Sequence, residues 1–517
     1  MSDLESKRNS PEPEDILYTS NAMDPSQLPI SKELWRIGLE QARERLQAGD
    51  DQEAAYLFKY LDKASLSFRA RIDLSRCELL TSLVGANDRA GGPISESIYA
   101  LQEIIYIRTK LGASNPNQLS YDYLALSEKY MRAEDYENAI NSFESALIHS
   151  EQDETGNFLH VQLAISLGLA QAQYRIGDFE SSIQTTRNVI AKFQEEPNYQ
   201  DVVLNQRLFL AHTLDLSGKP IDAERVTREV VRYTDELFSN DSEKRGYYLY
   251  EKAKMLLNNF KLSEASSTLD EVEALIPSEP SVLRAKMLVS LAELLSYNGE
   301  FEQAKAKLYK SLDVYKKLSE GEQLAELFSV HMYLGGVHCH TGDLEQARFH
   351  LQAAIESNNT DNKAGVFMSS AGIKQLEAAI ELAGESPNYE KAEKLLKEAL
   401  DVTREHSIGH QQLLSTAYVL CNLGECQLRQ GQLYMNSDLC EVAQGNFLQA
   451  WGIIEKRGRT SHPIAATTLG NLASTYEVLG DSKNADIYKI RAEVTFAELK
   501  GLSGESFFFG IDNSPEF

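Results

Sequence analysis

The sequence predicts an all-α protein built as a solenoid of about 10–11 helix-turn-helix repeats. Three observations support this fold class. The chain has 517 residues, more than one compact core of ordinary size accommodates. Hydrophobic residues make up 42% of it, enough for a continuous core. An amphipathic stretch, a short turn and a second amphipathic stretch recur along most of the chain.

The turns share a chemistry that ends one helix and starts the next. A glycine or other turn residue is often followed by Asp or Glu and then by a small residue that opens an apolar stripe. Glycine adopts the left-handed conformation that ends a helix, and the acid caps the next helix or favours its start electrostatically. The segments with this order are RAEDYENAINSFESAL (132–147), NGEFEQAKAKLYKSL (298–312), TGDLEQARFHLQAAI (341–355) and LGDSKNADIYKIRAE (479–493).

The small residue after each turn fixes the repeat register. Successive small residues, which we call anchors, are 39 to 51 positions apart. A large apolar residue usually follows four positions later and a small or β-branched one three positions after that, so all three share a helix face. The anchors are Ala54, Ser97, Ala139, Ser182, Ala223, Ala265, Ala304, Ala347, Ala392, Ala443 and Ala485.

A second amphipathic stretch precedes most anchors, with a small residue about twelve positions upstream. Small residues allow two helices to approach closely, while large ones fill the space to the next unit. Each repeat is therefore predicted to be a helix-turn-helix. The upstream small residues are Ser127, Ala170, Ala211, Ala253, Ala292, Gly335 and Ala473.

This pattern resembles the tetratricopeptide repeat family over roughly residues 35–497. The period of about 42 residues exceeds the family's common length of about 34. It resembles the subclass of kinesin light chains and of the spindle-orientation adaptor of polarised cells, most of all in residues 462–493. The resemblance implies a right-handed superhelical solenoid that binds peptides. Because no long heptad coiled coil precedes the repeats, it does not imply that the chain is a motor subunit.

The chain divides into three regions by composition. Residues 1–31 are polar and acidic, contain four prolines and are expected to be disordered. Residues 32–500 form the predicted solenoid. Residues 501–517 form a tail with aromatic and acidic residues, in which Phe507–Phe509 either cap the last repeat or act as a linear motif. Residues 429–441 make one repeat longer and are expected to project as an inserted loop.

Charge and cysteine content limit the partners and the location. The chain has 51 basic and 77 acidic residues, a net charge of −26. Such a surface repels nucleic-acid phosphates and anionic lipid and favours basic protein segments. The five cysteines lack paired spacing, no apolar run is long enough to span a membrane, and the first residues do not resemble a signal peptide. We therefore expect a cytoplasmic protein, with the nucleus left open.

The resemblance implies that the first helix of each repeat lines a concave binding surface. Asn422 and Asn471 stand at the same place in consecutive repeats, in CNLGE and GNLAS. An amide there offers a donor and an acceptor to the backbone of an extended peptide. The alternative is a pair of solvated asparagines. The same surface is expected to include Glu425, Arg429, Arg132 and Arg175 as charged peptide contacts, and His212, Lys254, Glu293 and Tyr333.

No motif in the sequence indicates catalysis. There is no phosphate-binding loop, dinucleotide fingerprint or nucleophile elbow. His331, His338, Cys339, His340 and His350 lie close in sequence but lack metal-ligand spacing, and His338 is expected to fill an interhelical position. Cys421 and Cys426 are expected to be buried small hydrophobes. No enzyme activity, cofactor or metal is expected.

The sequence thus predicts a non-enzymatic scaffold or adaptor that binds peptide or helical segments of other proteins, with membership of a multi-subunit complex left open. Two alternatives remain open. One is a structural subunit that wraps a permanent partner chain, and the other is a regulator that senses a peptide.

Overall fold

A computed structural model describes residues 32–65, 74–111, 115–152, 158–318, 324–358, 363–405 and 414–499. The predictions for the tails, 1–31 and 501–517, fall outside these ranges. Within them the chain forms α-helices, one short 3-10 helix (η3, Pro197–Tyr199) and no strand. The predicted all-α fold class is therefore confirmed.

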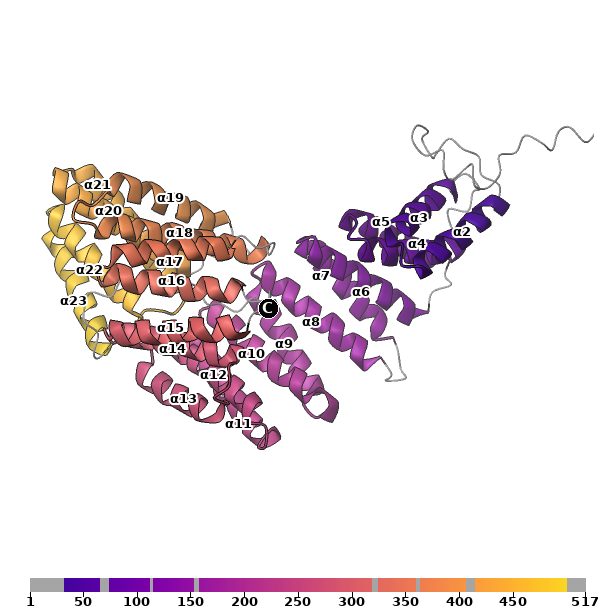
Figure 1. Cartoon of the computed structure of the whole chain (residues 1–517), viewed down its shortest axis with the longest axis horizontal. Coiled ribbons are helices and arrows are strands. Elements are labelled where there is room, and N and C mark those ends of the chain that lie inside the picture. The colour runs from indigo at the N-terminus through magenta and orange to yellow at the C-terminus, as the bar shows by residue number, and fades with distance from the viewer. Residues whose placement is uncertain are drawn as a thin grey trace, which may run out of the picture. The chain divides into compact units, whose positions relative to one another are not determined.

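The described helices follow one another as eleven consecutive pairs along the chain (Figure 1), and in ten of these pairs the two helices pack together. The pairs are α2 Lys32–Gln47 with α3 Asp51–Ser65, α4 Leu74–Arg89 with α5 Ile94–Leu111, α6 Pro116–Arg132 with α7 Tyr136–Ser150, α8 Leu159–Arg175 with α9 Phe179–Phe193, α10 Gln200–Leu216 with α11 Pro220–Leu237, α12 Ser242–Asn258 with α13 Leu262–Leu275, α14 Val282–Tyr297 with α15 Phe301–Leu318, α16 Leu324–His340 with α17 Leu344–Asn358, α18 Lys363–Ala383 with α19 Tyr389–Glu405, α20 Leu414–Tyr434 with α21 Ser437–Lys456, and α22 Pro463–Val478 with α23 Ser482–Glu498.

The chain separates into two compact units, Met1–Gln173 and Tyr174–Phe517. Unit 1 contains the described helices from α2 to the greater part of α8. Unit 2 contains the end of α8 and the helices from α9 to α23.

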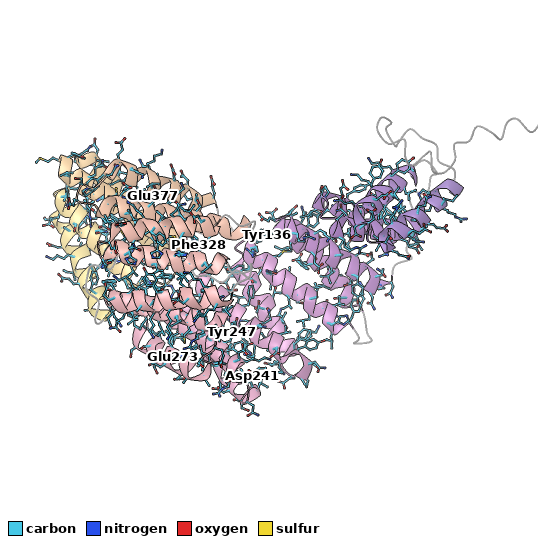
Figure 2. The ribbon with its side chains drawn as sticks, in the orientation of Figure 1. Tyr136, Asp241, Tyr247, Glu273, Phe328 and Glu377 are labelled. Atoms are coloured by element: carbon cyan, nitrogen blue, oxygen red, sulfur yellow. The ribbon has the colours of Figure 1, made fainter. Side chains whose placement is uncertain are left out.

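The predicted turn chemistry is present between the paired helices. Seven of the eleven turns hold a glycine in the left-handed region, at Gly49, Gly91, Gly177, Gly218, Gly299, Gly342 and Gly480. Aspartates then cap the following helices by accepting a backbone N–H three residues ahead, as Asp178 does from Ser181 and Asp481 from Asn484. Asp241 caps the first helix of its pair, α12, in the same way (Figure 2).

The anchors pack as the repeat pattern predicts. Every anchor except Ala485 has no exposed surface. Ala485 lies in α23, the second helix of the last described pair, and is partly exposed. Close approach also explains helical glycines, because a Cβ on Gly168 would lie 2.2 Å from the Phe143 ring.

The first helices of neighbouring pairs also contact one another and form what we call the inner layer of each unit. In unit 1 α2 contacts α4. In unit 2 the contacts run from α12 to α14, α16 and α18, and from α20 to α22. Packing first helices against each other curves an array of pairs toward its first helices.

A buried ion-pair network joins three helices of unit 1. Arg76 of α4 donates from Nε to Asp62 of α3 at 2.7 Å and from Nη1 to Glu103 of α5 at 2.8 Å. The arginine is 1% exposed. These two carboxylates hold the pKa of the Arg76 guanidinium above its usual value against the opposing effect of burial.

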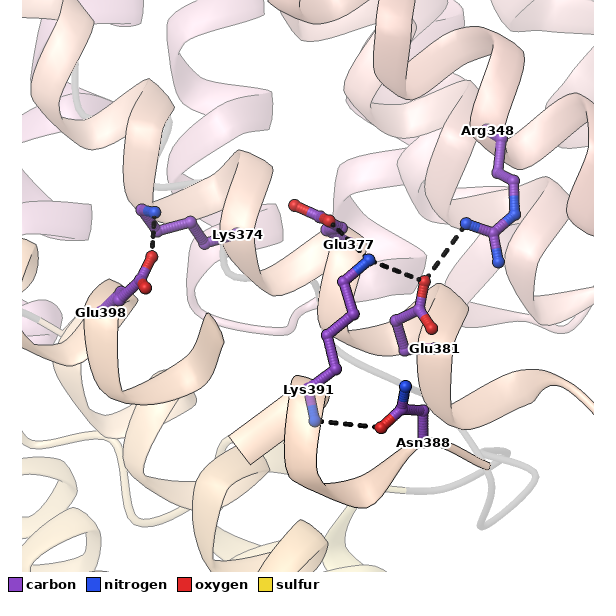
Figure 3. Close-up of polar contacts among 7 residues, drawn as sticks. All are labelled: Arg348, Lys374, Glu377, Glu381, Asn388, Lys391 and Glu398. Atoms are coloured by element: carbon purple, nitrogen blue, oxygen red, sulfur yellow. Dashed lines mark hydrogen bonds and ion pairs between the residues drawn. The ribbon is translucent and has the colours of Figure 1, made fainter. Parts of the chain in front are cut away.

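Exposed helix faces carry further ion pairs, seen across α17, α18 and α19 in Figure 3. Lys391 of α19 contacts Glu377 at 3.1 Å and Glu381 at 3.2 Å, and Glu381 also contacts Arg348 of α17 at 3.3 Å. Despite partial burial, these two cations lower the pKa of Glu381. Many surface charges of unit 2 are thus matched within the chain.

Unit 2 also has contacts between residues far apart in the sequence. We call the turn Lys456–His462, between α21 and α22, the clasp. Arg459 of the clasp donates from Nη2 to both carboxylate oxygens of Asp215, at 2.6 and 2.5 Å, and from Nη1 to Asn259. The clasp therefore contacts the end of α10 and the turn after α12, more than 190 positions earlier.

Backbone and apolar contacts complete this junction. Gly458 meets Gly218 closely, because a Cβ on Gly458 would lie 2.9 Å from the Gly218 carbonyl oxygen. Phe260, in the turn after α12, packs in one apolar cluster with Ala466 of α22 and Leu499 just after α23. The C-terminal pair of unit 2 thus closes back on the pairs near its beginning.

The expected projecting loop at residues 429–441 is wrong. α20 continues to Tyr434 and α21 begins at Ser437, so the extra residues lengthen both helices. Residues 429–434 contain no proline, and Gly431 packs so closely on α21 that a Cβ would lie 2.6 Å from the Cys440 sulfur. Asn436 caps α21.

Candidate functional site

A row of amide side chains crosses the inner layer of unit 2 at α18, α20 and α22. Asn422 Nδ2 on α20 donates to Gln375 Oε1 on α18 at 3.2 Å. Asn471 Nδ2 on α22 lies 3.8 Å from the Cys421 sulfur on α20. The structure therefore brings the two predicted asparagines onto adjacent first helices, each turned toward the preceding one.

Each amide keeps hydrogen-bonding capacity after these contacts. A primary amide has two N–H donors and one carbonyl acceptor, and the contacts use one donor on Asn422 and one on Asn471. Among the described residues, no donor reaches either Oδ1, and both side chains are partly exposed. Both can accept a further hydrogen bond from another chain.

Glu425 and Arg429 lie on the same helix as Asn422. They form an ion pair one helical turn apart, with Glu425 Oε1 as the acceptor, and the Arg429 side chain is 48% exposed. Such a pair is worth only about 0.3–0.5 kcal/mol. A partner group can therefore replace either member at little energetic cost.

The other two predicted arginines are the last residues of first helices. Arg132 ends α6 in unit 1, is exposed, and lies 3.9 Å from Asp88. Arg175 ends α8 at the start of unit 2 and is partly buried. Their predicted role as peptide contacts stays a prediction.

A second polar row follows the inner layer from α10 to α16. His212 Nε2 lies 3.6 Å from Glu251, which lies 3.6 Å from Lys254 Nζ. Glu293 accepts hydrogen bonds from the hydroxyl of Tyr297, at 3.1 Å, and from Tyr333. Burial raises the pKa of Glu293 against these contacts and against the attraction of Lys254.

The resemblance to tetratricopeptide repeats predicted His212, Lys254, Glu293 and Tyr333 on this surface but not Glu251 and Tyr297. Both missed residues had a usable signal. Glu251 stands three positions before Lys254 and Tyr297 four positions after Glu293, so each shares a helix face with a residue that was predicted.

The five cysteines are buried. All five are free thiols, and burial raises the pKa of Cys421 and of Cys426 to about 12. The prediction that these two are buried small residues is confirmed. Such thiols are poor nucleophiles at neutral pH because the thiolate is scarce.

The predicted histidine-rich repeat forms a hydrogen-bonded chain. His331 Nδ1 lies 3.0 Å from His350 Nδ1, and the Tyr309 hydroxyl bridges His350 Nε2 at 3.2 Å and His338 Nε2 at 3.1 Å. Burial lowers the pKa of His350 to about 4, with its two histidine neighbours adding to the effect. His338 is 5% exposed, which confirms its expected interhelical position.

The described part of the chain holds no group of three or more His, Cys, Asp or Glu side chains placed to bind a metal ion. It also contains no helix with the length and apolar character needed to cross a membrane.

Comparison with known proteins adds similarities of fold. No protein-family model and no curated protein sequence matches the chain. BtubC (BKLC) from P. vanneervenii is 21% identical over 47% of this chain and 93% of its own, with a TM-score of 0.34. A Rap protein, solved in complex with the Competence and Sporulation Factor, is 13% identical over 65% of this chain and 98% of its own, with a TM-score of 0.40.

A tetratricopeptide repeat protein from Parabacteroides merdae ATCC 43184 is 15% identical over 54% of this chain and 93% of its own, with a TM-score of 0.35. At these identities the similarity concerns the fold alone. The helical-repeat architecture implied by the resemblance to tetratricopeptide repeats is present in the chain itself, in its eleven described helix pairs.

Proposed function

We propose that this chain is a non-enzymatic adaptor that binds extended peptide segments of other proteins on the inner layer of unit 2. The observation that carries the proposal is the row of Gln375, Asn422 and Asn471 on consecutive first helices, with an accepting oxygen left over on each asparagine. An extended peptide presents backbone N–H and C=O groups, which such amides bind independently of side-chain identity.

Charge favours basic segments as partners. The chain carries a net charge of −26, and an acidic surface attracts Lys- and Arg-rich peptides over distances of about a Debye length. Glu425 can exchange Arg429 for a cation of the partner, since the exposed pair contributes little by itself. The same charge opposes binding to nucleic acid or anionic membrane.

The chemistry of the thiols suits a reducing compartment. Five free, buried cysteines with no disulfide are typical of cytoplasmic proteins. We therefore place the adaptor in the cytoplasm, with the nucleus as the alternative, and assign the repeat region to residues 32–500.

A selection with a displayed library of random twelve-residue peptides tests the proposal. Peptides enriched on the wild-type chain are synthesised, and their affinities are measured by fluorescence anisotropy. The double variant Asn422→Ala/Asn471→Ala should bind about 10- to 100-fold more weakly, because each lost hydrogen bond costs about 0.5–1.5 kcal/mol. Affinity should also fall as salt rises.

A matched control replaces two exposed asparagines on second helices, Asn141→Ala/Asn188→Ala. This variant should bind like the wild type. Equal affinities for both double variants, with both folded, would remove the inner layer of α20 and α22 as the binding surface.

A further inference from the structure

The clasp connects helix pairs that are not neighbours in sequence. It joins the turn between α21 and α22 to the α10–α11 and α12–α13 turns. In a repeat array each pair is stabilised mainly by its neighbours in sequence. Separation of Arg459 from Asp215 and Asn259 therefore leaves every neighbouring contact in place.

The closed junction holds specific favourable contacts. Arg459 is 7% exposed and binds Asp215 with a two-pronged ion pair, the strong geometry for this pair. Gly218, with φ of +81°, fits so closely that a Cβ there would lie 2.5 Å from the Lys456 carbonyl oxygen. This fit between two turns makes a defined closed state.

The closed junction also has an unfavourable feature. Among the described residues, the Nδ2 of Asn259 is buried with no hydrogen-bond acceptor. A buried donor without an acceptor destabilises the closed junction, and opening would let water satisfy it.

The junction covers inner-layer side chains. The Phe260 ring packs edge-on against Tyr297 of α14, with ring centroids 5.1 Å apart, and Tyr297 donates to Glu293. His462 of the clasp packs against Phe260 at 5.7 Å and against Tyr418 of α20 at 6.2 Å. The closed clasp therefore occupies the surface of the inner layer beside Tyr297 and Tyr418.

We propose that the clasp is a gate: unit 2 alternates between a closed form, in which Arg459 holds Asp215, and an open form in which the two part and the inner layer admits a peptide. The role in admission rests on the proposed peptide-binding function. The opening itself does not, so it can be measured without any partner.

The experiment places spin labels on Asn258→Cys and Thr460→Cys in the full chain. Both positions are exposed and adjoin the contacting residues, and the five native cysteines are buried, so labelling is selective. Double electron–electron resonance then gives the distance distribution between the labels. The wild type should show a dominant short distance and a minor longer one, and 1 M salt should increase the longer population.

Variants assign the two populations to the ion pair. Arg459→Ala should raise the open-to-closed ratio about a hundredfold or more, since removal of one partner from a buried pair is strongly unfavourable. Asp215→Asn should shift the ratio in the same direction and serves as a second test should Arg459→Ala fold poorly. Arg245→Ala removes a local pair with Asp235 between α11 and α12 and should leave the distances unchanged.

One narrow short distance at every salt concentration and in both clasp variants would overturn the gate. An opening that follows these predictions, in a protein that binds no selected peptide, would uphold the gate and count against the proposed function alone.

Discussion

His462 should make the stability of unit 2 depend on pH. This clasp residue is 5% exposed, and its Nδ1 accepts the backbone N–H of Ile464 at the start of α22. Nδ1 can accept this hydrogen bond only when it carries no proton, so the imidazole has to be neutral. Burial and, to a smaller extent, the Arg459 charge lower the pKa of His462 from an ordinary value of 6.5 to about 3. The experiment compares the stability of the wild type and of His462→Asn at pH 7.5 and at pH 4.5.

The sign follows from proton binding. Above pH 6.5 the imidazole is neutral in both states and titration contributes nothing. Between pH 6.5 and about 3 the unfolded chain binds a proton that the folded chain does not, so stability falls as pH falls. At pH 4.5, about two pH units below the ordinary pKa, proton binding has stabilised the unfolded state relative to the folded state by about 3 kcal/mol.

Asn is the matched replacement because it caps helices well and does not titrate. His462→Asn should lose some stability at pH 7.5 from poorer packing. Its further loss between pH 7.5 and 4.5 should be about 3 kcal/mol smaller than that of the wild type. The assay is urea unfolding followed by the fluorescence of Trp451, in a Trp35→Phe background so that α21 alone reports.

Subtracting the pH-dependent loss of stability of His462→Asn from that of the wild type removes the contribution of carboxylates elsewhere, because both proteins contain the same carboxylates. An equal pH-dependent loss in the two proteins would show that His462 is not held neutral by its surroundings. The assignment of the helix cap to Nδ1 would then be wrong as well.

Three further predictions concern stability. Arg76→Met should destabilise unit 1 by about 3–5 kcal/mol, because it leaves the buried Asp62 and the partly buried Glu103 without their cation. Arg89→Ala, which removes an exposed pair, should cost about 1 kcal/mol or less, and hydrogen exchange in α3–α5 measures both effects. Gly168→Ala should lower the thermal midpoint by forcing a methyl into a neighbouring ring, whereas Gly445→Ala, which meets open space, should raise it by up to a few degrees. Met435→Gly should stabilise the chain by about 1 kcal/mol in urea unfolding, because Met435 has φ of +54° and is 94% exposed, so little packing is lost.

The helix pairs could be predicted because their contacts are local in sequence. The anchors, the large residue four positions later and the glycine turns each specify a contact within a pair or to the next pair, and a period of about 42 residues repeats this information many times. The half-buried amides at Asn422 and Asn471 followed from the same register.

The lengthened α20–α21 hairpin could not be inferred from residue types alone. Residues 429–441 contain glycine, asparagine and aspartate, which are typical of turns, and the turn itself needs only Met435 and Asn436. Gly431 looked like a turn residue but serves close packing against Cys440 inside the hairpin.

The repeat pattern could not predict the clasp, for a different reason. Its residues, such as Arg459 and Asp215, are 244 positions apart and belong to no shared motif. Whether two such turns meet depends on the small rotation between successive pairs, summed over many of them, and each rotation depends on details of packing.

One sequence feature does mark the clasp once the turns are compared. Three turns place a residue other than glycine in the left-handed region, at Glu134, Phe260 and Met435. Glu134 and Met435 are exposed, so only a small backbone strain has to be tolerated there. Phe260 is 9% exposed, and a bulky ring in a strained turn is retained only where packing offsets the strain. Seven of the other ten turns hold a left-handed glycine, and Glu134 and Met435 are exposed, so the turn itself does not require a ring. A buried ring at this turn position therefore indicates a contact outside the repeat register, and here that contact is the one that closes unit 2.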